Sequence, residues 1–416
     1  MTSGAAYYGK WLAYGVAIGA IAGASALLLH YAVAAVSRAS GLIAGWAPWS
    51  RPLIAALGVF LSGLLAYAFV GGGEELSINA MIERYHKRRG EVEGRVPVLG
   101  WLASALDIGL GGPVGSEAPM AAMSGGFTSL VAGRLGLRGK DKRVAFAAAL
   151  GAGIGAILKA PLGGALLSAE ILYRRDAEWS VVYPALVASV VGWLVYSSAV
   201  GFGPLLGRHD SPVGPYELPL FVLLGAAAGL LARLYVYVLH GLQKAFRSLR
   251  INNYFKPAIG GLAAGLIGLL APQVLGEGIG YMGQALSDGL KAPPIVLAVL
   301  PVLKVAATSL AVGSGGVGGV FVPGLAAGSF LGLDVGLLLH ALLPTLVVDV
   351  APFVVAGMAA MFGAASRAPL AVAVMAVEMT GDISALPAVL VAVAASCAVA
   401  GDIAIFPAQP PRRQRA

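Results

Sequence analysis

The chain has 416 residues, of which 58% are hydrophobic and only 12% are charged, and its formal net charge is +8. A soluble domain carries about 25% charged residues, so this composition excludes a soluble enzyme with a polar surface and a disordered chain. It indicates a polytopic membrane protein. Cys397 is the lone cysteine, and the five histidines lack metal-ligand spacing, so we expect no disulfide, no metal and no other cofactor.

Twelve apolar segments follow one another along the chain, and we expect all of them to be helical because none alternates like a strand of a membrane barrel. They cover residues 11–30, 52–70, 97–112, 117–136, 144–171, 180–201, 218–240, 258–272, 294–312, 319–343, 351–377 and 384–405. The first lacks a convincing cleavage site, which indicates a retained helix. Several exceed the ~20 residues that span a bilayer, while others are broken by Gly and Pro. Short basic clusters between them are typical of membrane loops and not of a nucleic-acid-binding face.

The second half of the chain repeats the first. Residues 51–54 (RPLI) recur as 256–259 (KPAI), a shift of 205, and residues 159–162 (KAPL) recur as 367–370 (RAPL), a shift of 208. Seven collinear matches fall at shifts of 204 to 208. One match between apolar segments would be weak, but a collinear series indicates a duplication.

The repeat predicts the domain organisation. We expect one transmembrane repeat over residues 1–212, a second over 213–405, and a short basic cytoplasmic tail over 406–416 without a regulatory domain. Interruptions at corresponding places are typical of transporters that bind their substrate between the repeats. The predicted fold is an all-α polytopic protein, with two halves arranged as inverted repeats that contain broken and re-entrant helices.

Three glycine-rich turns, at residues 71–75, 111–119 and 315–323, each precede an apolar helical segment. Unpaired backbone amides are tolerated inside a membrane only where they face protein, water or a ligand. Several helix N-termini that meet would present N–H groups and partial positive charge, which together make an anion site. The alternative is that the glycines only let helices pack closely, and we favour it for isolated pairs such as Gly19 and Gly23.

The order of these turns resembles the CLC family of chloride channels and proton-coupled chloride transporters. Residues 115–119 (GSEAP) are similar to the family's G-[KR]-E-G-P, residues 318–323 (GGVFVP) to its G-x-F-x-P, and residues 378–381 (EMTG) to its E-[LM]-T-G. The resemblance covers nearly the whole chain. It implies chloride transport without enzymatic activity or nucleotide, in the cell membrane of a prokaryote, by a homodimer with one pathway in each subunit.

The resemblance also implies the residues of the pathway. Glu117 corresponds to the gating glutamate, whose anionic carboxylate can occupy the site that chloride uses and whose protonation would release it. The expected anion-binding residues are Gly72, Gly115, Gly318, Gly319, Val320, Phe321 and Phe406.

The chain departs from the family pattern at informative positions. Gly72 replaces a serine that helps to bind the central anion, and Phe406 is the nearest aromatic residue to an anion-coordinating tyrosine. The second glutamate, which passes protons in coupled members, corresponds to Ile171, with Glu170 beside it. An isoleucine holds no proton, so we favour a passive channel or weakly coupled transport. A proton-coupled antiporter, with Glu170 on the proton path, is the alternative.

Other ionisable residues have two interpretations each. Glu170 and Glu378 occupy equivalent positions, where they either cap helices or relay protons, and capping is favoured. Asp107 and Lys304 lie in apolar segments and either pair with each other or face the pathway. Residues 74–75 are both glutamates, which would repel chloride near the anion path unless they point away or bind a cation.

Two other classes of function are weaker. An intramembrane hydrolase would need Ser314 or Ser366 to pair with His340, and no second catalytic element supports it. A cation-coupled carrier of another repeat fold is disfavoured by the GGVFVP run at residues 318–323. No P-loop is present, so nucleotide-driven transport is not expected.

Overall fold

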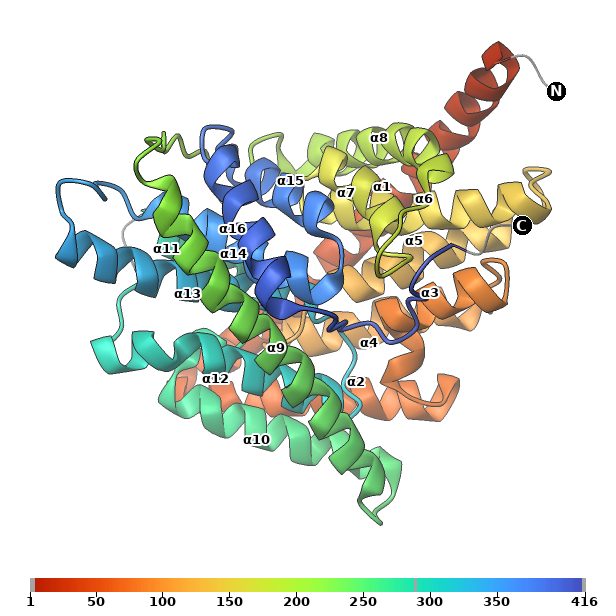
Figure 1. Cartoon of the computed structure of the whole chain (residues 1–416). Helices are drawn as coiled ribbons and strands as arrows, with labels where there is room; N and C mark the ends of the chain where they lie inside the picture. Colours follow the sequence, from red (N-terminus) through yellow and green to blue (C-terminus); the bar gives the residue numbers. More distant parts are fainter. Residues whose placement is uncertain (1–3, 288–289, 414–416) are drawn as a thin grey trace.

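The computed structural model describes residues 4–287 and 290–413, which form sixteen α-helices and five short 3-10 helices (Figure 1). Residues 1–3 of the predicted first repeat and residues 414–416 of the predicted tail lie outside the described residues. Within the described residues, six helices are long and apolar enough to cross a membrane, and shorter apolar helices lie among them. The fold is therefore that of an all-helical, multi-span membrane protein.

The helices fall into two series of eight. The first series is α1 (Gly4–Trp46), α2 (Arg51–Val70), α3 (Ile78–Lys87), α4 (Arg95–Gly109), α5 (Glu117–Val131), α6 (Gly139–Ile157), α7 (Pro161–Glu170) and α8 (Val182–Val200). The second is α9 (Leu218–Ser248), α10 (Lys256–Leu270), α11 (Ile279–Ser287), α12 (Pro294–Gly313), α13 (Phe321–Leu342), α14 (Ala351–Ser366), α15 (Pro369–Thr380) and α16 (Leu386–Ala400). The 3-10 helices are Pro48–Ser50, Gly73–Leu76, Trp179–Val181, Asn253–Phe255 and Pro272–Val274.

Two of the apolar segments each contain two helices in the structure. Residues 144–171 form most of α6 and then α7, and residues 351–377 form α14 and most of α15. A proline begins each new helix, because its ring and missing N–H prevent a preceding helix from continuing through it. Lys159 (φ 53°) and Arg367 (φ 61°) both adopt the left-handed conformation just before these breaks. The matched KAPL and RAPL segments therefore share a backbone geometry as well as a sequence pattern.

The centre of the molecule contains equivalent helices from the two series. Every residue of α14 is buried, and so is α6 from Val144 to its end. A helix that is apolar on all sides is expected to be buried on all sides. Around these two, α1 packs on α8 and α9 packs on α16.

Glycines set the distance between these outer pairs of helices. A Cβ atom added at Gly19 or Gly23 of α1 would collide with backbone carbonyls of α8. This confirms that Gly19 and Gly23 serve close packing. Small residues let transmembrane helices approach in this way.

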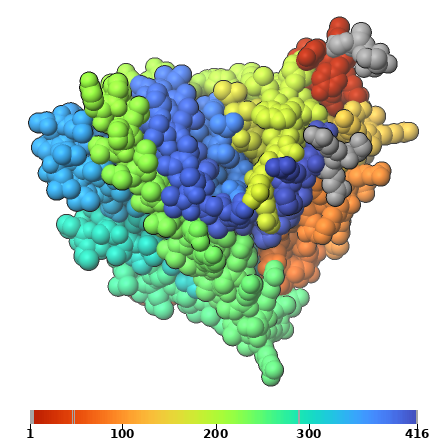
Figure 2. Space-filling model, in the orientation of Figure 1, coloured from red at the N-terminus to blue at the C-terminus, as the bar shows by residue number. Residues whose placement is uncertain are grey.

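After α16 the chain crosses the surface toward the connection between α7 and α8 and toward α3 (Figure 2). Backbone hydrogen bonds fix this C-terminal segment. The N–H of Arg174 donates to the carbonyl of Pro410 at 3.0 Å, and the N–H of Arg175 donates to that of Pro411 at 3.1 Å. The segment is thus part of the folded structure as far as it is described.

Candidate functional site

Two of the glycine-rich turns meet inside the protein. The N–H of Gly115 donates to the carbonyl of Gly319 at 2.9 Å, and the N–H of Gly319 donates to the carbonyl of Gly115 at 2.7 Å. This isolated antiparallel bridge joins the turn before α5 to the turn before α13. The N-termini of two helices, one from each series, consequently lie together, as an anion site requires.

Glu117 is the first residue of α5, and its side chain is completely buried at this junction. Its Oε1 atom accepts a hydrogen bond from the backbone N–H of Phe321, the first residue of α13, at 2.5 Å. Its Oε2 atom is buried and has no hydrogen-bond partner among the described residues. The carboxylate therefore occupies a helix N-terminus where an anion would bind.

The glycines on either side leave the room that this carboxylate needs. A Cβ atom at Gly319 would overlap Glu117 Oε1, and one at Gly115 would overlap Oε2. Neither glycine has a positive φ, so the requirement is one of space and not of backbone conformation. The two glycines thus hold the backbone close to the buried carboxylate.

Most backbone amides of the expected anion-binding residues already donate a hydrogen bond within the protein. Those of Gly115 and Gly319 form the bridge, and that of Gly72 donates to the carbonyl of Ala66 at 3.1 Å. Gly72 has a φ of 140°, which glycine adopts readily. The Phe321 amide differs from these because its acceptor is a titratable side chain.

Tyr235 of α9 is a site residue that the sequence analysis missed. It is completely buried, and its hydroxyl donates to the carbonyl of Val320 at 3.0 Å. The contact fixes the turn immediately before the Phe321 amide. A tyrosine within an apolar helix was the available signal, because a buried phenol needs a hydrogen-bond partner.

A cavity of about 370 Å³ leads to this junction. It is lined by Gly318, Gly319 and Val320 on one side and by Phe406 on another. Four expected site residues therefore share one cavity, and Gly73, the neighbour of Gly72, lines it as well.

Helix α9 adds cationic groups to the wall of this cavity. His240, Lys244 and Arg247 line it at spacings of four and three residues, which place them on one face of the helix. Arg247 also forms an ion pair with Glu74 at 2.5 Å. Because Glu74 also lines the cavity and balances Arg247, Lys244 is the residue of this face that adds positive charge beside the route to Glu117.

The pair of glutamates that the sequence left unexplained is neutralised by arginines. Glu74 pairs with Arg247, and Glu75 pairs with Arg84 at 2.7 Å. Arg84 also donates to the carbonyl of Glu75 at 2.8 Å. Each of the two glutamates therefore has an arginine partner within the protein.

Asp107 and Lys304 are completely buried, and each has partners of its own. Asp107 Oδ2 accepts from the hydroxyl of Ser62 at 2.6 Å and from the N–H of Val317 at 3.1 Å, which supports the glycine-rich turn at residues 315–323. Lys304 Nζ donates to the carbonyls of Val274 and Gly276 at 2.8 and 2.6 Å. Within the described residues the two charges form no ion pair with each other.

Glu277 is a second carboxylate near the gate that the sequence analysis missed. It lies beside Ser116, and its charge acts on both Glu117 and Lys304. Its Oε1 atom is buried without a partner among the residues described. The signal in the sequence was that residues 276–278 (GEG) match residues 71–73 (GGG) at a shift of 205, within the collinear series.

The profile of the voltage-gated chloride channel family matches residues 72–401 of the chain. The chain belongs to the CLC family. A ClcB-like putative chloride channel protein of Ralstonia nicotianae is 30% identical over 339 residues, which cover 80% of this chain and 78% of that protein.

Two solved structures show the same fold as this CLC chain. A slow cyanobacterial Cl⁻/H⁺ antiporter has a TM-score of 0.82 at 22% identity, covering 94% of both chains. A CLC-type fluoride/proton antiporter has a TM-score of 0.80 at 18% identity, covering 97% of this chain and 98% of the other. The protein is a CLC-type anion transport protein of the membrane and not an enzyme.

Glu170 and Glu378 of this CLC protein cap each other's helices. Glu378 accepts from the N–H groups of Leu162 and Gly163, at 3.0 and 2.7 Å, at the start of α7. Glu170, at the end of α7, accepts from the N–H of Ala371 at 2.8 Å, at the start of α15. The predicted capping is therefore observed, but across the two halves instead of within one helix.

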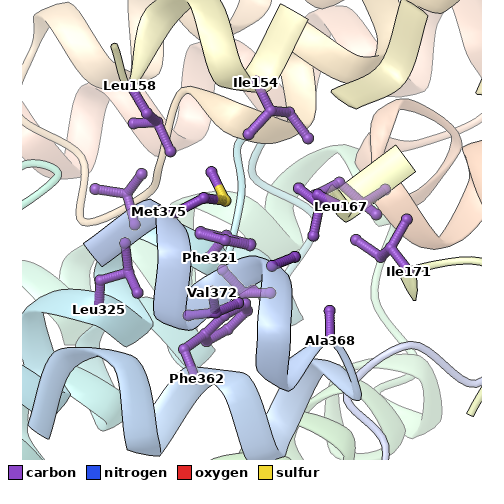
Figure 3. Close-up of a cluster of buried hydrophobic side chains, with 14 of the residues drawn as sticks. Ile154, Leu158, Leu167, Ile171, Phe321, Leu325, Phe362, Ala368, Val372 and Met375 are labelled. Atoms are coloured by element: carbon purple, nitrogen blue, oxygen red, sulfur yellow. The ribbon is translucent and has the colours of Figure 1, made fainter. Parts of the chain in front are cut away.

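Ile171, which we expect at the family's proton-transfer position, is 2% exposed. Figure 3 shows Ile171 and Phe321 in one cluster of hydrophobic side chains, with Leu167, Val372 and Met375 among the others. All of the side chains drawn there end in carbon or sulfur atoms. Hydrophobic side chains thus fill the space between Ile171 and Phe321 in this cluster.

The two serines considered as the nucleophile of a hydrolase both donate hydrogen bonds to backbone carbonyls. Ser314 donates to the carbonyl of Ala311 at 2.9 Å and Ser366 to that of Phe362 at 2.7 Å. His340 Nδ1 lies 2.7 Å from the carbonyl of Val347. Among the described residues, no hydrogen bond joins either serine to His340, so the pair that a hydrolase needs is not formed.

Proposed function

We propose that the protein conducts chloride through the cavity beside α9, and that Glu117 opens and closes this path. The contact between Glu117 Oε1 and the Phe321 amide carries the proposal. A carboxylate and a chloride ion compete for one donor because both are anionic hydrogen-bond acceptors. Chloride flux then requires the Glu117 carboxylate to move away from the Phe321 amide.

Protonation of the Glu117 carboxylate allows it to move away from the Phe321 amide. A neutral carboxyl group is a weaker acceptor and is not attracted by the partial positive charge of the α13 N-terminus. At lower pH a larger share of the Glu117 carboxyl groups is protonated and therefore neutral. We therefore expect conduction to increase as the pH falls.

Conduction is passive or only weakly coupled to protons in this proposal. The apolar cluster around Ile171 and Phe321 supports it, because exchange needs a proton route from the cytoplasm to Glu117. The missing serine and tyrosine of the family pattern, at Gly72 and Phe406, would weaken the barrier that keeps chloride from passing freely.

A proton-coupled antiporter is the second candidate. The observation that favours it is the position of Glu170. This residue is next to Ile171 in the sequence, and its carboxylate lies at the end of α7. The two neighbours in fold are also described as antiporters. In this alternative, water between Glu170 and Glu117 would carry the proton.

The two halves, residues 1–212 and 213–405, are inverted repeats in this proposal, with residues 406–416 as a cytoplasmic tail. The matched breaks before α7 and α15 and the reciprocal glutamate caps support a twofold relation between the halves. The protein acts in a prokaryotic cell membrane as a homodimer with one path in each subunit. Exposed leucines on the adjoining helices α7, α8 and α15 (Leu162, Leu194 and Leu370) provide an apolar face for the second subunit.

Purified protein in liposomes tests both candidates. Chloride efflux and proton movement are recorded together without ATP, with empty liposomes as the control. The proposal predicts chloride flux with little or no proton movement against its gradient. Uphill proton movement at a fixed ratio to chloride, abolished by Glu117→Gln, would establish the antiporter, and no anion flux between pH 4 and pH 8 would exclude both.

A further inference from the structure

A second cavity, of about 720 Å³, lies where the C-terminal segment meets the connection between α7 and α8. It shares no lining residue with the cavity that leads to Glu117. Arg174 and Arg175 hold its C-terminal wall through their bonds to Pro410 and Pro411, and the N–H of Ala408 donates to Asn79 Oδ1 at 2.8 Å. The wall is thus fixed by backbone hydrogen bonds.

Positive charge dominates the lining of this second cavity. Lys87, Lys140, Arg143, Arg412 and Arg413 contribute five cations. Burial lowers the pKa of His86, which also lines it, so that this imidazole is neutral at pH 7. The charge therefore comes from the lysines and arginines alone.

The carboxylate in the lining, Glu178, neutralises only one of these five cations. It pairs with Arg413 at 3.0 Å and accepts from the hydroxyl of Ser180 at 2.6 Å. Neither Lys140 nor Arg412 forms an ion pair within residues 4–287 and 290–413. At least two cations therefore face the cavity without an acid to balance them.

Arg143 is held for ligand binding by an aromatic ring. Its guanidinium lies 4.2 Å from the centroid of the Tyr85 ring, a cation–π arrangement that fixes the planar group in place. Its buried Nε atom has no hydrogen-bond partner among the described residues. A guanidinium with free donors in a fixed orientation is suited to bidentate contacts with phosphate oxygens.

We propose that this second cavity binds a phosphate-bearing anion. Its volume falls in the range of about 300–1,000 Å³ that is typical of small-molecule sites, and a chloride ion would leave most of it empty. Clusters of lysine and arginine face the cytoplasm in membrane proteins, where phosphorylated metabolites and anionic lipids are found. Trp179, next to Glu178, is 64% exposed, as is typical of residues at the membrane interface.

The chemistry recognised is the phosphate group, which either a free phosphate compound or a lipid headgroup can supply. The full-length protein is placed in nanodiscs of phosphatidylcholine and titrated with tripolyphosphate at constant ionic strength. In a second arm, binding to phosphatidylcholine vesicles is compared with binding to vesicles that also contain a phosphatidylinositol phosphate. The first arm reports a free ligand and the second a lipid headgroup.

The double variant Lys140→Gln, Arg412→Gln removes two of the unpaired cations without disturbing the stacked Arg143. The matched control is Lys142→Gln, because Lys142 lies on the same helix but pairs with Glu91 at 3.1 Å and does not line the cavity. We expect the double variant to weaken binding by at least about tenfold, since each lost contact to a charged group contributes roughly 1 kcal/mol or more. The control variant should bind like the unchanged protein.

Arg143→Gln provides a second variant if the first one does not fold. Binding in either arm that is lost in the cavity variants and retained in Lys142→Gln supports the proposal and identifies the source of the phosphate. Absence of binding in both arms would overturn it. Equal weakening by the cavity variants and by Lys142→Gln would also overturn it, because it would indicate attraction to general surface charge.

Discussion

The carboxylate of Glu117, from the first half of the chain, accepts a hydrogen bond from the backbone N–H of Phe321, from the second half, at 2.5 Å. Each residue begins a helix, α5 or α13. The proposed gate and the proposed anion donor therefore come from corresponding positions in the two series of helices. Because the donor is a backbone amide, a side-chain substitution at residue 321 would leave it in place, whereas a substitution at residue 117 frees it.

Glu117→Gln should remove the pH dependence of chloride flux. The amide side chain cannot ionise, so its attraction to the Phe321 donor no longer changes with pH. At neutral pH we expect flux above that of the unchanged protein by roughly tenfold, since a hydrogen bond to a charged acceptor exceeds a neutral one by about 1–1.5 kcal/mol. Chloride efflux from liposomes between pH 4 and pH 8 measures both effects.

Glu91→Gln is the control for that experiment, because Glu91 is an exposed carboxylate that pairs with Lys142 far from the cavity. Its curve of flux against pH should match that of the unchanged protein. If Glu117→Gln also gave this curve, another group would control access to the path.

Gly319→Ala should act on the gate without changing its charge. The new methyl group would occupy the space of Glu117 Oε1, which forces the carboxylate away from the Phe321 amide. We expect flux at neutral pH to rise and its pH dependence to weaken. Gly283→Ala is the control, because a Cβ atom there meets nothing within 4 Å. A normal pH curve in a folded Gly319→Ala protein would contradict the assigned position of the carboxylate.

The local parts of this site could be predicted from the sequence. A glutamate between a glycine turn and Pro119 has the pattern of a first helical turn, and the structure begins α5 at Glu117. The duplication stays a prediction, which rests on the collinear series of matching residues. The helix breaks before Pro161 and Pro369 lie inside apolar runs, so the prolines and not the hydropathy pattern indicate them.

Contacts between distant segments could not be predicted in the same way. Tyr235 is 85 residues from the carbonyl that it binds, and nothing in the apolar pattern of α9 indicates this partner. The reciprocal caps formed by Glu170 and Glu378 join residues more than 200 positions apart. Such pairings depend on how the two halves pack, which periodicity within one helix does not encode.

Glu170→Gln and Glu378→Gln form a matched pair of variants, since each glutamate caps a helix of the other half. Both should lower the apparent melting temperature in detergent, because a neutral acceptor weakens each cap by roughly 1 kcal/mol. Neither should change proton movement in a passive channel. Proton movement that is lost only in Glu170→Gln would place this residue on a proton path and support the antiporter.

Lys244→Gln should reduce chloride flux by a few-fold at low ionic strength and leave it nearly unchanged at high salt. The lysine lines the cavity that leads to Glu117, and positive charge in a cleft raises the local anion concentration until salt screens it. Arg250→Gln is the control, because Arg250 is exposed and does not line the cavity. Equal effects of the two variants at low salt would argue against a specific role of the cavity wall.

Bromide binding at the Phe321 amide tests the central claim most directly. Crystals of the unchanged protein at neutral pH and of Glu117→Ala are soaked in bromide, and anomalous density locates the ion. Competition for one donor predicts bromide within hydrogen-bond distance of the Phe321 N–H in Glu117→Ala, and none there when the carboxylate is in place. Bromide bound elsewhere in the cavity of Glu117→Ala, with the Phe321 amide unoccupied, would contradict the account.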